Sequence, residues 1–240
     1  MKKNKVWFVT GASKGLGLAL VKTLIKEGYQ VAATTRDLPA ITKEVGESLS
    51  FLPLQMDLLD EKSVEDAIGR AVQSFGRIDV VVNNAGYGQL GTIEELTDKE
   101  ARQNFDVNVF GSLNVIRKVM PYWRQQRSGA FFNISSIGGF FAGFPGWGIY
   151  CASKFAVAGF TESLAAEVKS FGISATVVYP GYFRTNFLLE GSLNLPHQPI
   201  EEYVEARQLE AVHQNEIPGN QPGDPDKAAK ALIEVAEKDE

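Results

Sequence analysis

The chain is poor in the residues that build disulfides and metal sites. It has one cysteine, Cys151, and two histidines, His197 and His213, among 240 residues. A single cysteine cannot form an intramolecular disulfide, and the two histidines lack the spacing of a zinc site. We therefore expect neither a disulfide framework nor a bound metal.

Long apolar runs and an excess of positive charge are also missing. No run approaches the length of a membrane span, and the apolar stretch before Gly11 is too short for a signal-peptide core. The net charge is −5 and the pI is near 5.3, whereas nucleic-acid-binding proteins are usually basic. These absences predict a cytoplasmic protein without nucleic-acid or membrane partners, and they still allow a small anionic ligand.

Short β-branched apolar runs alternate with helical patterns along most of the chain. Apolar residues fill nearly every position of these runs, as expected for strands that helices cover on both faces. The expected strands are 6–10, 30–35, 51–55, 78–83, 130–134 and 174–179, and the expected helices are 16–27, 63–75, 98–120, 150–171, 200–216 and 225–238. The alternation predicts one α/β domain over residues 1–240, with a doubly wound, mostly parallel sheet of the Rossmann type.

The composition changes between residues 186 and 225. Gly, Pro, Gln and Asn accumulate there around one expected helix. We predict that this segment is an insertion that forms a mobile lid near a substrate site, and not a second domain.

A tyrosine and a lysine lie four positions apart in Tyr150-Cys151-Ala152-Ser153-Lys154. At that spacing both side chains lie on one face of a helix, one turn apart. A nearby positive charge favours phenolate, so Lys154 should lower the pKa of Tyr150 and allow it to exchange a proton with a substrate oxygen. Alone the pair is a weak signal, because the same spacing occurs by chance on many helices.

A glycine-rich turn, Thr10–Gly17, stands between the first expected strand and the first expected helix. Glycines at this point permit a tight turn, and the N–H groups of the following helix N-terminus can then bind a pyrophosphate. The position of the turn predicts a dinucleotide-binding site.

Six motifs in order resemble those of the classical short-chain dehydrogenase/reductase family. They are Thr10–Gly17 (TGxxxGxG), Asn83-Asn84-Ala85-Gly86, Asn108, Ser135-Ser136, Tyr150 with Lys154, and Pro180-Gly181 with Thr185. The resemblance runs from residue 6 to about residue 186. It implies a nicotinamide-dependent oxidoreductase that reduces a ketone or aldehyde to an alcohol, reversibly.

The resemblance also implies catalytic roles. Tyr150 would be the general acid/base, and Lys154 would lower its pKa and bind the nicotinamide ribose. Ser136 would bind the substrate carbonyl oxygen, and Asn108 would hold a water that links Lys154 to solvent. Ser136 precedes Tyr150 by fourteen positions, one more than is usual in the family, so the neighbouring Ser135 is an alternative.

Basic residues near the expected adenosine ribose favour NADP(H). Lys14 lies in the turn and Arg36 follows the second strand, while Asp37 leaves NAD(H) possible. For Asp57 a capping role is as good an interpretation as a cofactor contact. The expected cofactor-binding residues are Gly11, Ser13, Lys14, Gly15, Leu16, Gly17, Arg36, Asp57, Leu58, Asn84, Ala85, Gly86, Tyr150, Lys154, Pro180, Gly181, Phe183 and Thr185.

Aromatic residues precede and follow the expected catalytic groups. Such residues at the carboxyl ends of strands suggest a pocket for a small apolar or aryl carbonyl substrate, although they can also serve packing alone. The loop before Tyr150 carries Phe140, Phe141, Phe144 and Trp147, and the segment after Pro180 carries Tyr182 and Phe187.

Two other functions are alternatives. A hydroxysteroid- or retinol-type dehydrogenase is the alternative within the family, and an NADP-binding regulator without chemistry is the alternative outside it. Family members usually end with a seventh strand, but residues 228–236 have a helical pattern and charges follow, so we expect a sheet without that strand. The resemblance implies a homodimer or homotetramer, the dimer forming through helices 98–120 and 150–171.

Overall fold

The computed structural model describes residues 5–189 and 191–238. In these residues the main sheet has six strands in the order β3-β2-β1-β4-β6-β7, and every pairing is parallel. The strands are β1 (Val6–Val9), β2 (Gln30–Thr35), β3 (Phe51–Gln55), β4 (Val80–Asn83), β6 (Gly129–Ile134) and β7 (Ile173–Val178). The predicted doubly wound fold is confirmed. The strand order reverses at β1 and β4, where folds of this type open a ligand-binding crevice.

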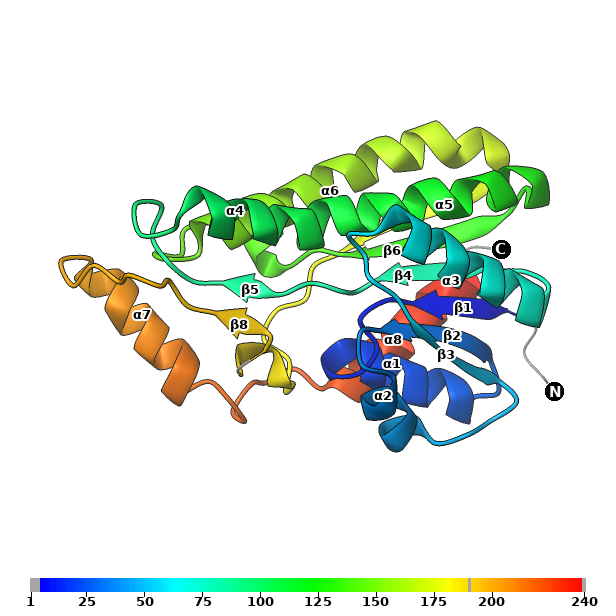
Figure 1. Cartoon of the computed structure of the whole chain (residues 1–240), viewed down its shortest axis with the longest axis horizontal. Helices are drawn as coiled ribbons and strands as arrows, with labels where there is room; N and C mark the ends of the chain where they lie inside the picture. The colour runs from blue at the N-terminus through cyan, green and yellow to red at the C-terminus, as the bar shows by residue number, and fades with distance from the viewer. Residues whose placement is uncertain (1–4, 190, 239–240) are drawn as a thin grey trace.

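Helices cover both faces of the sheet (Figure 1). One layer consists of α1 (Gly15–Lys26), α2 (Leu38–Val45) and α8 (Pro225–Lys238), and the other of α3 (Glu61–Phe75), α5 (Gly111–Gln126) and α6 (Gly148–Val168). Successive side chains of a strand point to opposite faces, so Trp7 and Val9 join the first core and Phe8 joins the second. This two-sided burial explains why the strand sequences are apolar at nearly every position.

The helix predicted over residues 98–120 is three elements. A π-helical turn, η1 (Asp106–Phe110), lies between α4 (Asp98–Phe105) and α5. Such turns widen the helix by one residue and often occur at functional sites. Here the turn contains Asn108. The amphipathic pattern runs through it unbroken, so the sequence prediction missed it.

Several shorter elements were also not predicted. Asp37 accepts a hydrogen bond from the Ala40 backbone N–H at 3.2 Å and so caps α2. The two-residue strands β5 (Gly88–Gln89) and β8 (Leu193–Asn194) pair in parallel in a second sheet. The expected helix 200–216 is α7 (Val204–Asn215), which begins four residues later.

Residues 186–189 and 191–224 lie beyond the main sheet, beside β5 (Figure 1). Glu95, whose side chain is fully buried, anchors them to the rest of the chain. The Glu95 carboxylate accepts hydrogen bonds from the Ile200 backbone N–H at 2.7 Å and from the Arg207 guanidinium at 3.0 Å. Within the described ranges α8 is the last element, and none of the helices is long and apolar enough to cross a membrane.

Candidate active site

A cavity of about 1100 Å³ lies among the segments that follow β1, β2, β3, β4, β6 and β7. Almost all residues predicted to bind a cofactor or a substrate line it. The exceptions are Gly17, which packs against Asn84, the loop residues Phe140 and Phe141, and the catalytic candidate Asn108, which is buried behind Gly86. The structure therefore brings the six motifs together in one site.

Two glycines of the turn pack against the segment after β4. Gly11 has a φ of +64°, and a Cβ there would lie 2.7 Å from the Cα of Ala85. A Cβ on Gly17 would lie 2.5 Å from the Gly11 carbonyl oxygen and from Asn84 Nδ2. The Asn84 amide donates to the carbonyl oxygens of Thr10 and Gly11, both at 2.9 Å. The close packing holds the turn in one shape and allows no larger residue.

The N-terminus of α1 is open to the cavity. Its N-cap residue, Lys14, is extended and provides no capping side chain, and Lys14, Gly15 and Leu16 all line the cavity. First-turn N–H groups carry a partial positive charge and have no partner within the helix. This end of the cavity is suited to an anionic group such as a pyrophosphate.

Positive charge continues along the same wall. Lys14 and Arg36 line the cavity, and burial followed by the charge of Arg36 lowers the pKa of Lys14. The Asp37 side chain is engaged in capping α2. Asp57 also lines the cavity, but its carboxylate accepts the Leu59 N–H at 2.9 Å, while Asp60 caps α3.

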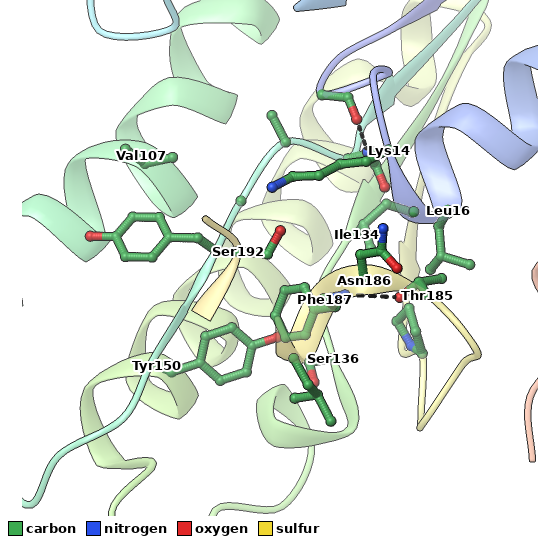
Figure 2. A pocket seen from close by; sticks show the side chains of 18 of the residues that line it. Lys14, Leu16, Val107, Ile134, Ser136, Tyr150, Thr185, Asn186, Phe187 and Ser192 are labelled. Carbon is green, nitrogen blue, oxygen red and sulfur yellow. Dashed lines mark hydrogen bonds between the residues drawn. The ribbon is translucent and has the colours of Figure 1, made fainter. Parts of the chain in front are cut away.

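Tyr150, in the first turn of α6, is the most buried phenol of the cavity wall. Burial raises the pKa of Tyr150 above its usual range, and a side-chain hydrogen bond with Ser136 acts in the opposite direction. Figure 2 shows Tyr150, Ser136 and Phe187 together, with Lys14 on the other side of the pocket. The prediction that the tyrosine pKa is lowered was wrong for this structure, because desolvation outweighs the favourable contacts.

Lys154 lies one turn further along α6 and is also buried. Its ammonium is 5.8 Å from the centre of the Tyr150 ring and donates to the Ile134 carbonyl oxygen at 2.9 Å. Burial lowers the pKa of Lys154 to about 8. A lysine with that pKa can exchange protons near neutral pH.

The two adjacent serines have different partners. Ser135 is buried, and its hydroxyl donates to the Lys154 carbonyl oxygen at 2.8 Å. Ser136 accepts the Gly138 N–H at 3.1 Å, which starts the short turn η2 (Ile137–Gly139), and it lines the cavity beside Tyr150. The structure thus brings Ser136 to the tyrosine although the sequence spacing is one residue longer.

Asn108 supports the site from behind. Its amide nitrogen donates to the Tyr87 carbonyl oxygen and to the Ser153 hydroxyl, both at 3.1 Å, and its side-chain oxygen accepts the Tyr87 N–H at 3.0 Å. A Cβ on Gly86 would lie 2.9 Å from that oxygen and 3.5 Å from Lys154 Nζ. Gly86 therefore packs against both Asn108 and the lysine.

The aromatic residues divide into two groups. Phe144, Trp147, Tyr182 and Phe187 line the cavity as predicted, and the Trp147 ring is 5.2 Å from the Tyr150 ring in an edge-to-face contact. The suggestion that Phe140 and Phe141 also line the pocket was wrong. They are 72% and 57% exposed and lie outside the cavity lining, because η2 turns them away.

Several lining residues were missed by the sequence reasoning. They come from the segment beyond residue 186 and from α7, where no motif marks them, so only the folded chain reveals them. They include Leu188, Ser192, Asn194, His213 and Gln221.

Comparison with known proteins identifies similar chains. A family model described as short chain dehydrogenase matches residues 5–193. Oxidoreductase BOA17 of Botryotinia fuckeliana is 40% identical over 187 residues, which is 77% of this chain and 68% of that protein. The crystal structure of a short-chain dehydrogenase from Streptomyces avermitilis is 35% identical, with a TM-score of 0.87 over 97% of this chain and 85% of the other.

Two similar solved structures contain a cofactor. ElxO with NADP bound is 27% identical, with a TM-score of 0.79 over 98% of this chain and 92% of that one. A 3-ketoacyl-(acyl-carrier-protein) reductase from Brucella melitensis, complexed with NADH, is 25% identical with a TM-score of 0.81 over the same shares.

Proposed function

Because this chain is an oxidoreductase of the short-chain dehydrogenase/reductase family, we propose that it reduces a ketone or aldehyde to an alcohol, with NADPH as the cofactor and Tyr150 as the general acid. The observation that carries the proposal is that Tyr150, Ser136 and the open N-terminus of α1 all line one cavity. The reverse oxidation uses the same groups.

The residues present fit a nicotinamide dinucleotide. The uncapped start of α1 and the close-packed Gly11 suit a pyrophosphate. Asn84, Gly86 and the segment from Pro180 to Thr185 continue the cavity wall toward Tyr150. When bound, the reduced nicotinamide supplies the hydride that the carbonyl carbon receives.

The protein supplies the proton and the charge stabilisation. A phenol is protonated at neutral pH, and in that form Tyr150 can donate its proton to the carbonyl oxygen during reduction. Ser136 donates a hydrogen bond to the same oxygen and stabilises the charge that develops there. Lys154 stabilises the phenolate that remains, and Asn108 holds the water through which the tyrosine regains its proton.

The preference for NADPH rests on two cations and one carboxylate. Lys14 and Arg36 line the cavity beside each other, and a 2′-phosphate needs such positive charge. Asp37, the residue that could bind a free 2′-hydroxyl, also lines the cavity, but its Oδ1 accepts the Ala40 N–H and caps α2. ElxO, which contains NADP, and the Brucella reductase, which contains NADH, are both similar to this chain, so we infer the preference from Lys14, Arg36 and Asp37 and not from these relatives.

Single-turnover absorbance of NADPH with a panel of ketones and aldehydes tests the proposal. Tyr150→Phe should lower the rate about 10²- to 10⁴-fold, as expected for loss of a general acid, and should leave the affinity for NADPH within a few-fold. Tyr179→Phe is the matched control, since Tyr179 lies outside the cavity lining. Full activity of Tyr150→Phe would refute the mechanism, and NADPH binding without oxidation by any carbonyl would favour a regulator.

A further inference from the structure

His213 and Tyr182 form a hydrogen-bonded pair in the wall of the cavity. The Tyr182 hydroxyl and His213 Nε2 are 2.9 Å apart, and both residues line the cavity. His213 belongs to α7, whereas Tyr182 follows β7. The histidine is 2% exposed, so this pair is a built part of the site and not a surface contact.

The second ring nitrogen determines the direction of this hydrogen bond. His213 Nδ1 lies 2.8 Å from the Leu209 carbonyl oxygen. A carbonyl can only accept, so Nδ1 carries the proton. Burial lowers the pKa of His213 and keeps the ring neutral at pH 7. A neutral imidazole has one N–H, and Nε2 is therefore the acceptor of the Tyr182 proton.

This direction changes what Tyr182 offers to a ligand. Its single proton is engaged with His213, so the phenol oxygen can only accept further hydrogen bonds. Tyr182 is 40% exposed and lines the cavity, so a ligand can reach it. The pair thus presents an acceptor, although a tyrosine alone could present either a donor or an acceptor.

The acceptor lies near the reacting end of the cavity. The Trp147 ring is 5.2 Å from the Tyr150 ring and 5.0 Å from the His213 ring, so the tryptophan connects the two. A group that binds Tyr182 would therefore belong to the same small molecule as the carbonyl that Tyr150 protonates.

We propose that the Tyr182–His213 pair selects carbonyl substrates that carry a hydrogen-bond donor, a hydroxyl or an amino group, close to the carbonyl. His213 is the positioning residue, and Tyr182 makes the contact. The inference rests on the proposed function. Trp147, Phe187 and Leu188 line the same cavity, so a ligand that brings an apolar group to the Tyr182 oxygen would displace water from it without replacing the lost hydrogen bond.

Matched ketones test this selectivity. The 2′-, 3′- and 4′-hydroxyacetophenones are compared with their methoxy counterparts, which keep the oxygen and lose the donor. For at least one ring position we expect kcat/KM to favour the hydroxyl compound about tenfold, with the ratio falling to about 1 in Tyr182→Phe. In His213→Leu the Tyr182 hydroxyl no longer donates to the histidine and can donate to a ligand oxygen. The hydroxyl-to-methoxy ratio should therefore fall below 1.

Two variants serve as matched controls. Tyr179→Phe removes a phenol that packs against Phe140, and His197→Gln removes a histidine whose side chain is 80% exposed. Neither should change the hydroxyl-to-methoxy ratio. Circular dichroism checks that each variant is folded, and Tyr182→Phe alone decides the question if His213→Leu does not fold.

The outcomes separate this inference from the proposed function. Reduction of the ketones with a ratio below two at every position, or with a ratio that Tyr182→Phe leaves unchanged, overturns the inference and leaves the proposed function intact. Absence of reduction with every ketone refutes the proposed function. In that case isothermal titration calorimetry compares the affinities of the matching hydroxyphenyl and methoxyphenyl ethanols for the protein with NADP⁺. The ratio of the two association constants then decides the inference.

Discussion

Lys14, in the glycine-rich turn, donates a hydrogen bond from Nζ to the carbonyl oxygen of Gly191, 2.7 Å away. The two residues are 177 positions apart, and the bond joins the wall around the α1 N-terminus to the segment that carries Phe187. The same ammonium is a proposed ligand of the cofactor phosphate. We therefore expect cofactor binding and the position of residues 186–194 to be coupled.

Replacing Lys14 by methionine tests this coupling. The variant keeps the apolar stem and loses the bond to Gly191, so amide exchange in peptides covering residues 186–194 should increase severalfold in the cofactor-free protein. Lys22→Met is the control, because Lys22 pairs with Glu44 on the surface. Exchange rates equal to those of the unmodified protein would show that the bond does not hold the segment.

Arg36 should determine which nicotinamide dinucleotide is preferred. Arg36→Asp replaces the expected partner of the 2′-phosphate by a carboxylate that repels it, so KM for NADPH should rise at least tenfold while KM for NADH falls or is unchanged. Arg70→Asp makes the same charge change on α3, outside the cavity lining. Equal effects of Arg36→Asp on both cofactors would contradict the proposed preference.

Replacement by alanine should weaken cofactor binding at Gly17 and stabilise the fold at Gly69. A Cβ on Gly17 would lie 2.5 Å from the Gly11 carbonyl oxygen, so Gly17→Ala should distort the turn and weaken NADPH binding about tenfold or more. Gly69 is inside α3, and the described residues leave more than 4 Å around its Cβ position. Gly69→Ala should raise the free energy of unfolding by up to about 1 kcal/mol, measured in urea.

The buried Lys154 should make stability depend on pH. Its pKa is about 8 in the folded chain and 10.5 for a lysine in the unfolded chain, so the unfolded state binds more protons between these values. The contribution of Lys154 to stability therefore rises with pH from about 8 to 10.5 and is least favourable below 8.

Lys154→Met removes this dependence. We expect the variant to be more stable at pH 7 by on the order of 2 kcal/mol, with the advantage shrinking toward pH 10, and to be inactive. The loss of the hydrogen bond to the Ile134 carbonyl reduces this gain in stability. Urea unfolding of both proteins across this range measures the difference, and an advantage that does not change with pH would contradict the lowered pKa.

The parts of the site that were predicted from sequence depend on local spacing. The glycine-rich turn directly follows β1, and Tyr150 and Lys154 are one helical turn apart, so their geometry follows from neighbouring residues. The parallel sheet was predicted from short apolar runs that alternate with helical patterns. These features are encoded within about twenty residues of chain.

The parts that were missed depend on contacts between distant segments. His213 enters the cavity only because α7 folds back over the loop that carries Trp147. The pKa of Tyr150 is raised and not lowered as predicted, because the burial that raises it is a property of the whole fold. The π turn at Asn108 and the exposure of Phe140 likewise depend on packing that periodicity does not report.

The pairing of β5 with β8 has a consequence for engineering this scaffold. Gly88 N–H donates to the Ser192 carbonyl and Leu90 N–H donates to the Asn194 carbonyl, each at 2.9 Å. These bonds give the segment after residue 186 a fixed register against the chain that leaves the catalytic centre. A chimera that exchanges this segment between relatives must preserve the number of residues between Thr185 and Leu193. One inserted residue would turn each side chain of β8 to the opposite face and exchange Asn194, which lines the cavity, for Leu193, which is buried in the apolar cluster.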